Sequence, residues 1–137
     1  MTTRELSQLY YLTQEIKRAR ERLAELRTAA ASAAAHITGM PRSNSASDRT
    51  AASAIRQADL EDTLDRKIEL LETERIKLLT YINSIPDSLT RQIFQLRFEE
   101  LLTYTQIVWR LGGGNTEWGI KKRIQRELAR RNTEESA

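Results

Sequence analysis

Residues 102–124 read LTYTQIVWRLGGGNTEWGIKKRI, and this stretch decides the fold of the C-terminal part of the chain. Thr103 and Gln106 have the spacing of a capping box, in which each side chain bonds the backbone N–H of the other residue at the start of a helix. Glycines at 112–114 then interrupt the apolar pattern, as glycines at helix ends do. The stretch therefore predicts a short helix over 104–111 followed by a glycine turn.

A second, basic helix is expected after the glycine turn. Asn115 or Thr116 is in position to cap it, because both residue types accept hydrogen bonds from the free N–H groups at a helix start. Ile120, Ile124 and Leu128 recur every four residues, so they form one inward-facing stripe. The outward face and its flanks carry Glu117, Trp118, Lys121, Lys122, Gln125, Arg126 and Ala129. A short helix, a glycine turn and a basic helix follow one another in a helix-turn-helix unit.

The positive charge of the chain is concentrated in this last helix. The whole chain has 22 Lys and Arg against 19 Asp and Glu, a net charge of +3. Residues 116–131 alone hold six basic and two acidic residues, a net charge of +4. A basic helix is often a plain solvated face, but the helix-turn-helix order favours contact with DNA phosphates. The residues expected to contact phosphate are Lys121, Lys122, Arg123 and Arg126.

The candidates for base recognition lie on the same helix: Glu117, Trp118, Lys122 and Gln125. A glutamine forms paired hydrogen bonds with adenine in the major groove, although an ordinary surface residue is the simpler interpretation of Gln125. Trp118 either packs against the bundle or the preceding helices, or contacts sugars and thymine methyl groups. Trp109, in the short helix, is expected in the core of the bundle.

The helix-turn-helix unit is predicted to belong to a domain over 86–131. Asp87, directly after Pro86, is a typical N-cap residue and marks the start of a preceding helix that runs through Glu100. The apolar face of that helix consists of Leu89, Ile93, Leu96 and Phe98. Residues 132–137 are expected to form a disordered tail.

The first forty residues carry apolar side chains at alternating spacings of three and four, which is a heptad pattern. The positions are Leu9, Leu12, Ile16, Ala19, Leu23, Leu26, Ala30, Ala33 and Ile37. Because neither Gly nor Pro occurs before Gly39, one long helix is predicted here.

A second heptad helix is predicted from Asp48 or Thr50 to Pro86. Its core positions carry Leu64, Ile68, Leu71, Arg75, Leu78, Ile82 and Ile85. A Gly-Met-Pro break and a Ser/Asn tract separate the two helices, and they predict a flexible loop over about 39–49. Two long helices joined in this way predict an antiparallel coiled-coil hairpin over 1–85.

The hairpin has two explanations. The heptad positions either serve only to pack one helix on the other, or the hairpin also mediates self-association. We favour a homodimer, because several apolar residues lie off the main seams and would stay exposed in a lone hairpin. These residues are Tyr10, Tyr11, Leu60, Ile76 and Leu79.

The composition argues against an enzyme, and no metal or cofactor is expected. The chain has no Cys, so it has no thiol nucleophile and no Cys-ligated metal, and His36 is its only His. The adjacent carboxylates at 99–100 and 134–135 have no His or third carboxylate near them in the pattern. Glycines 112–114 lack the following Lys-Ser/Thr of a phosphate-binding loop.

Neither a membrane nor a secretory pathway is indicated. No apolar run approaches the ~20 residues that span a bilayer, and the N-terminus lacks a basic region followed by an apolar one. The expected location is the cytoplasm.

Four motifs follow one another in the C-terminal third. They are Ile85-Pro86-Asp87, Arg91-Gln92-Ile93-Phe94-Gln95-Leu96-Arg97-Phe98, Leu102-Thr103-Tyr104-Thr105-Gln106-Ile107 and Leu111-Gly112. Together they resemble the fourth conserved region of bacterial sigma factors, over roughly residues 85–130. The whole chain, with its Gly39-Met40-Pro41 break between two helices, also resembles phage-encoded late transcriptional regulators of the ArpU and RinA type.

This resemblance implies a function in the bacterial host cell: sequence-specific binding of double-stranded DNA and activation of phage late or packaging genes, with host RNA polymerase as a further partner. Thr116 corresponds by position to the cap of the recognition helix. The groove-facing positions correspond to Glu117, Trp118, Lys121 and Lys122. The chain departs from the sigma pattern in its turn over 112–115, which is about two residues longer, and in Gly119 within the helix.

The sequence thus predicts an all-α protein, in which a long antiparallel coiled-coil hairpin is followed by a small helix-turn-helix bundle like the fourth sigma region. DNA-binding regulation is the favoured function. A phage small terminase subunit, which takes part in DNA packaging, is one alternative. A sigma-like protein-interaction module that does not read DNA is another.

Overall fold

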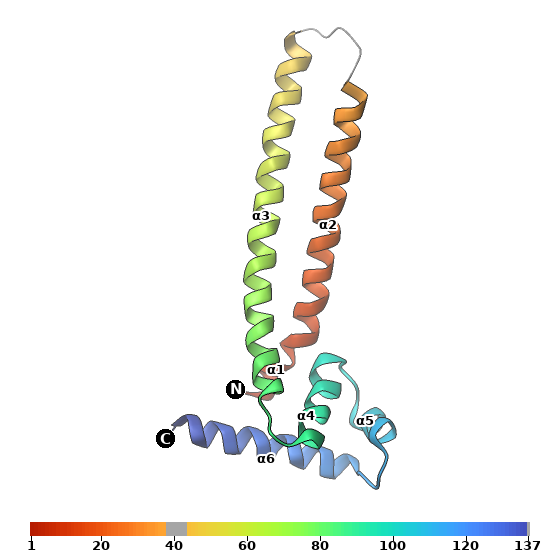
Figure 1. Ribbon diagram of the computed structural model, residues 1–137, viewed down its shortest axis with the longest axis vertical. Coiled ribbons are helices and arrows are strands. Elements are labelled where there is room, and N and C mark those ends of the chain that lie inside the picture. Colours follow the sequence, from red (N-terminus) through yellow and green to blue (C-terminus); the bar gives the residue numbers. More distant parts are fainter. Residues whose placement is uncertain (38–43, 137) are drawn as a thin grey trace. The chain divides into compact units, whose positions relative to one another are not determined.

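The computed structural model describes residues 1–37 and 44–136, and every regular element in this part of the chain is a helix (Figure 1). The elements are α1 (Thr3–Leu6), α2 (Gln8–Ile37), α3 (Asn44–Asn83), α4 (Ser88–Phe94), the π-helical turn η1 (Gln95–Glu99), α5 (Tyr104–Leu111) and α6 (Glu117–Ser136). The predicted all-α class is confirmed.

The chain divides into two compact units. One unit is Gln14–Glu72, and the other combines Met1–Thr13 with Thr73–Ala137. Helices α2 and α3 contribute residues to both units, whereas α4, η1, α5 and α6 belong entirely to the second.

In the unit Gln14–Glu72, α2 and α3 lie side by side and run antiparallel (Figure 1). Arg27 pairs with Asp65 at 3.6 Å, and Glu15 pairs with Lys67 at 3.3 Å. The heptad residues of α2 in this unit that are buried are Ile16, Ala19 and Leu23. The facing heptad residues of α3, Leu64, Ile68 and Leu71, are only half-buried. The heptad side chains of α2 are therefore more deeply buried than those of α3.

The N-terminal prediction of one continuous helix is wrong, because Ser7 separates α1 from α2. Thr2 and Glu5 form a capping box that starts α1, with the backbone N–H of Thr2 donating to the Glu5 carboxylate at 2.6 Å. The Ser7 hydroxyl donates to the carbonyl oxygen of Thr3 at 2.7 Å.

The predicted start of the second long helix is also wrong. Helix α3 begins at Asn44, so residues 44–49 of the expected loop are helical. Ser, Asn and Asp are common at the N-terminal end of a helix, and the Ser/Asn tract is compatible with either state. The rest of the expected loop, including Gly39 and Pro41, lies outside the described residues.

The predicted disordered tail over 132–137 is wrong as well, because α6 continues to Ser136. The Arg130 guanidinium binds the Glu134 carboxylate at 2.5 Å, a favourable i,i+4 pair on a helix. The Asn132 amide donates to the backbone carbonyl of Met1 at 3.0 Å. These contacts extend the last helix beyond its predicted end.

The core of the second unit joins α5 and α6 to the preceding helices. Its most deeply buried side chains are Leu6, Leu9, Ile82, Ile85, Ile93, Phe94, Phe98, Ile107 and Ile120. The rings of Phe94 and Phe98 lie 5.5 Å apart between centroids. The small bundle is thus built around two aromatic rings on α4 and η1.

The helix predicted through Glu100 changes character before its end. The Glu100 N–H donates to the carbonyl of Gln95 at 3.3 Å, a bond that spans five residues and is typical of a π-helix. Leu101 follows with a φ of 55°, a backbone conformation that is uncommon for a residue with a side chain. The chain turns sharply here and enters α5.

Candidate nucleic-acid interface

The predicted capping box at the start of α5 is confirmed. The Gln106 N–H donates to the Thr103 hydroxyl at 3.2 Å, and the Thr103 N–H donates to the Gln106 side-chain oxygen at 2.8 Å. Helix α5 buries Ile107 completely. Trp109, which was predicted to lie in the core, is 84% exposed. Two residues after Ile107 a helix has rotated by about 200°, so Trp109 faces away from the core.

The turn between α5 and α6 depends on glycine. Gly112, Gly113 and Gly114 have φ values of 61°, 64° and 77°, which residues with side chains rarely adopt. The Asn115 side-chain amide donates to the Gly112 carbonyl at 2.6 Å and closes the turn. Thr116 is the residue that caps α6, because its hydroxyl accepts the Gly119 N–H at 3.1 Å. The two candidate caps therefore have different roles.

The inward face of α6 is confirmed. Ile120, Ile124 and Leu128 are all buried against the bundle. Glu117 anchors the first turn of the helix, because its carboxylate accepts a hydrogen bond from the Thr105 hydroxyl of α5 at 2.6 Å. Glu117, a candidate for base recognition, is thus engaged within the protein, and no spacing in the sequence pointed to Thr105 as its partner.

The outward face of α6 presents an indole beside an ammonium group. Trp118 is 67% exposed, and the Nζ atom of Lys122 lies 5.4 Å from the centroid of its ring. At this distance a cation is attracted to the negative face of the ring. Gln125 is exposed close by on the same helix. The alternative prediction, that Trp118 packs into the bundle, is wrong.

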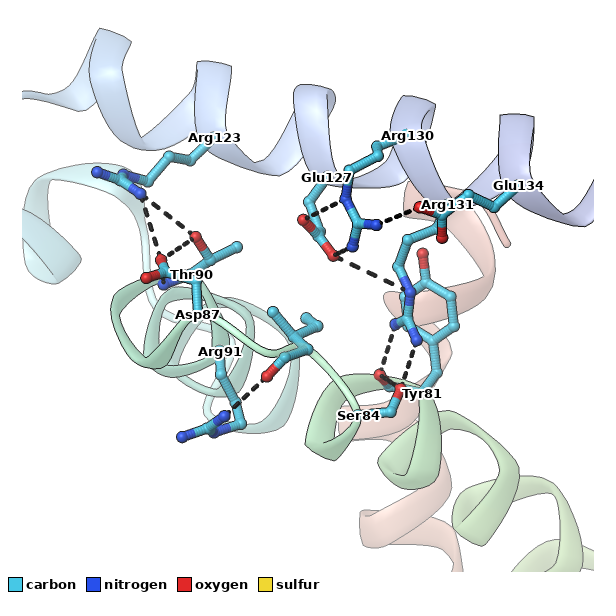
Figure 2. Close-up of polar contacts among 11 residues, drawn as sticks. Tyr81, Ser84, Asp87, Thr90, Arg91, Arg123, Glu127, Arg130, Arg131 and Glu134 are labelled. Carbon is cyan, nitrogen blue, oxygen red and sulfur yellow. Dashed lines mark hydrogen bonds and ion pairs between the residues drawn. The ribbon is translucent and has the colours of Figure 1, made fainter.

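Arg123 points from α6 to the start of α4 (Figure 2). Its guanidinium lies 3.4 Å from the Asp87 carboxylate and 3.4 Å from the Thr90 hydroxyl. The same Asp87 oxygen caps α4 by accepting the Thr90 N–H at 2.9 Å and the Thr90 hydroxyl at 2.6 Å. These hydrogen bonds from Thr90, helped by the charges of Arg123 and Arg91, lower the pKa of Asp87. Arg123 therefore faces an ionised carboxylate at neutral pH.

The two arginines at the C-terminal half of α6 are also held within the protein (Figure 2). Arg130 binds the Glu127 carboxylate at 2.7 Å. Arg131 donates to the backbone carbonyl of Tyr81 at 2.7 Å, and its guanidinium stacks 4.0 Å from the centroid of the Tyr81 ring. Arg130 is thus paired with carboxylates of α6 itself, and Arg131 connects α6 to α3. Neither guanidinium lacks a partner within the protein.

The six cations of α6 thus fall into two groups. Arg123, Arg130 and Arg131 bind carboxylates of the same chain. Lys121, Lys122 and Arg126 have no carboxylate partner among residues 1–37 and 44–136, and all three lie in the N-terminal half of α6. An uncompensated cation keeps its attraction for an external anion, so these three side chains are the ones available to phosphate.

Part of this division is readable in the sequence. Glu127 precedes Arg130 by three residues and Arg131 by four, spacings at which helical side chains meet. Asp87 and Thr90 gave no such signal, because they are more than thirty residues from Arg123. Only the packing of α4 on α6 brings them together.

The described residues hold no group of three or more His, Cys, Asp or Glu side chains that could bind a metal ion. No helix in the described part of the chain combines the length and the apolar character that crossing a membrane requires. Comparisons of this chain with protein-family models, with curated proteins and with solved structures found no match.

Proposed function

We propose that the chain is a sequence-specific DNA-binding transcription regulator, which inserts the N-terminal half of α6 into the major groove of DNA. The observation that carries the proposal is the clustering of Lys121, Lys122 and Arg126, three cations without a carboxylate partner in the described chain, on the exposed part of one helix. The major groove is about 12 Å wide and admits an α-helix. Uncompensated cations on such a helix supply the salt-dependent attraction to phosphates.

Base recognition falls to the other exposed side chains of the same half of α6. The Gln125 amide has the donor and acceptor needed for paired hydrogen bonds with adenine. Trp118 is 67% exposed and offers an apolar surface for a backbone sugar or for the thymine methyl group next to it. The α5–turn–α6 segment acts in this proposal as a helix-turn-helix, in which the Thr103 cap and the glycine turn fix the direction of α6.

The remaining parts of the proposal rest mainly on the sequence. The heptad patterns over 1–85 favour a coiled-coil hairpin that joins two copies of the chain. A two-fold dimer would set two α6 helices about 34 Å apart, one turn of DNA, and would read an imperfect palindrome or a repeat. The resemblance to phage late regulators favours activation of late or packaging genes in the cytoplasm of a bacterial host, with host RNA polymerase as a partner.

Selection from random DNA duplexes tests the proposed function. The full chain is mixed with a random pool, and the bound fraction is amplified and sequenced over several rounds. We expect enrichment of one motif, and an affinity for it that falls steeply as the salt concentration rises. A pool that stays random after repeated rounds would contradict DNA reading and favour a protein-interaction module.

A charge-matched pair of variants locates the surface. Lys121→Gln with Lys122→Gln removes two of the uncompensated cations of α6 and should weaken binding at least tenfold at low salt. Lys17→Gln with Arg18→Gln removes the same charge from an exposed part of α2 and serves as the control. Equal losses in both double variants would mean that only net charge matters, and that α6 is not the DNA-binding helix.

A further inference from the structure

A groove runs along α6 on the side that faces α4. It is open to solvent, has a volume of about 440 Å³, and is lined on the α6 side by Trp118, Gly119, Lys122 and Arg126, with Thr90 of α4 opposite. All of these residues belong to the same compact unit. The groove lies beside the exposed helix face that carries Gln125, and not on it.

The charges of this groove are unevenly compensated. Arg123, Arg130 and Glu127 also line it. Arg123 binds the Asp87 carboxylate at 3.4 Å, and Arg130 neutralises the Glu127 carboxylate at 2.7 Å. Lys122 and Arg126 have no carboxylate partner in the described part of the chain. They are four residues apart, which is one helical turn or about 6 Å along the axis. Two neighbouring cations with this spacing suit a row of anions better than a single one.

The groove also has room close to the helix backbone. Gly119 contributes no side chain to it, so an extended ligand can approach the helix between Trp118 and Lys122. At one end of the groove the exposed indole of Trp118 presents an apolar surface. A ligand that carries regularly spaced monoanions joined by less polar units fits this combination, and a phosphodiester backbone with its sugars is such a ligand.

We propose that the α4–α6 groove holds the sugar-phosphate backbone of one DNA strand, with Lys122 and Arg126 on successive phosphates and Trp118 against a sugar. This inference rests on the proposed function and refines it. Gln125 and Arg126 are separated by about 100° around the helix, and Lys121 and Arg126 by about 140°. Trp118 lies about 20° and Lys122 about 60° from Gln125, so the base-reading face borders the phosphate-binding side, which continues through Arg126 toward α4.

Salt titration of the full chain on a selected duplex tests the assignment. Each phosphate contact contributes about 0.9 to the slope of the logarithm of affinity against the logarithm of salt concentration. The double variant Lys122→Gln with Arg126→Gln should lose about two phosphate contacts. Raising the salt from 50 to 200 mM should therefore weaken wild-type binding by a factor about ten times larger than it weakens binding of the variant. Lys17→Gln with Arg18→Gln should keep the wild-type slope.

Uncharged methylphosphonate linkages, placed one at a time along each strand, locate the contact. In the wild type we expect weakened binding at two neighbouring positions of one strand. In the Lys122→Gln, Arg126→Gln variant the same substitutions should have no further effect. Circular dichroism of the variant should match the wild type, because both side chains are solvent-accessible.

Three results would overturn the inference. A wild-type salt slope in the groove variant, together with an unchanged selected motif, would remove the groove from the interface and leave the proposed function standing. Methylphosphonate effects that persist unchanged in the variant would do the same. If polyglutamate displaces the bound duplex as well as DNA of the same charge does, and if the double variant no longer responds to polyglutamate, the groove binds an acidic peptide instead. Absence of any selected motif in the wild type would instead refute the proposed function.

Discussion

The guanidinium of Arg123 on α6 lies 3.4 Å from the carboxylate of Asp87, the residue that caps α4. The same carboxylate also accepts two hydrogen bonds from Thr90, so a single acidic side chain both caps α4 and contacts α6. An ion pair this exposed contributes little by itself. It directs Arg123 toward α4, so that Lys121, Lys122 and Arg126 are the cations of α6 without a carboxylate partner among the described residues.

Replacing Asp87 should destabilise the protein in a pH-dependent way. The folded-state pKa of Asp87 is lowered, so its ionised form stabilises the fold above the unfolded pKa of about 3.9, and this contribution is lost as the pH falls through the folded pKa. Urea denaturation should find Asp87→Ala less stable than the wild type at pH 7, and the difference should narrow near pH 2. Asp87→Asn keeps a capping oxygen without the charge, so its stability at pH 7 should lie between that of the wild type and that of Asp87→Ala. A difference that stays constant across this range would show that the charge of Asp87 is irrelevant.

Replacing Glu99 should stabilise the protein at neutral pH, in contrast to replacing Asp87. Burial raises the pKa of Glu99, with Arg75 opposing the shift and the charge of Glu100 adding to it. The protonated form is therefore favoured in the folded state, and its stabilising contribution is present at acid pH and lost as the pH rises through the folded pKa. Glu99→Gln should raise the stability in urea at pH 7 and bring no gain below about pH 4. Glu135→Gln, an exposed position on α6, is the matched control and should change little at either pH.

The turn before α6 should tolerate a D-residue better than an L-residue. Gly112 has φ 61° and ψ −148°, a combination that is the mirror image of an ordinary extended conformation. A Cβ placed there would meet no atom within 4 Å, so the cost of a substitution is conformational and not steric. Gly112→Ala should lose about 1–3 kcal/mol of unfolding free energy. A semisynthetic protein with D-alanine at 112 should match or exceed the wild type, and equal losses for both forms would contradict the observed turn.

The mass of the chain in solution should report its assembly. Sedimentation equilibrium should give twice the chain mass of 15.8 kDa, because the facing heptad residues of α3 are only half-buried along Gln14–Glu72 and a second copy would cover them. A ring of about eight copies or more would favour a DNA-packaging subunit over a regulator. A strict monomer at micromolar concentration would contradict self-association through the heptad helices.

The features predicted correctly from the sequence are those that depend on neighbours along the chain. The capping box of Thr103 and Gln106 and the inward stripe of Ile120, Ile124 and Leu128 follow from spacings of three or four residues. Residue type limited the cap of α6 to Asn115 or Thr116, and the structure has Thr116. Helix periodicity and capping chemistry act over a single turn, so they can be read without knowledge of the fold. The glycine turn is of the same kind, since positive φ values favour glycine in any context.

The predictions that failed depend on longer-range packing or on weak local preferences. Trp109 is an exception, because the helix periodicity that turns Ile107 inward already directs a residue two positions later outward. The tail over 132–136 is polar, and contacts such as that of Asn132 with Met1 accompany its helical conformation. The tract 44–49 is compatible with a loop or a helix end, and its composition alone did not distinguish them.

Local patterns along the chain specify an all-α protein, a capped short helix, a glycine turn and a last helix with six cations. Which of these cations remain without a carboxylate partner depends on how the helices pack. Packing of α6 against α4 and α3 brings Arg123 to Asp87 and Arg131 to Tyr81, over separations of 36 and 50 residues. A charge pattern records how many cations a helix carries, but an ion pair forms only where folding brings opposite charges within a few ångströms, and no local spacing encodes that approach.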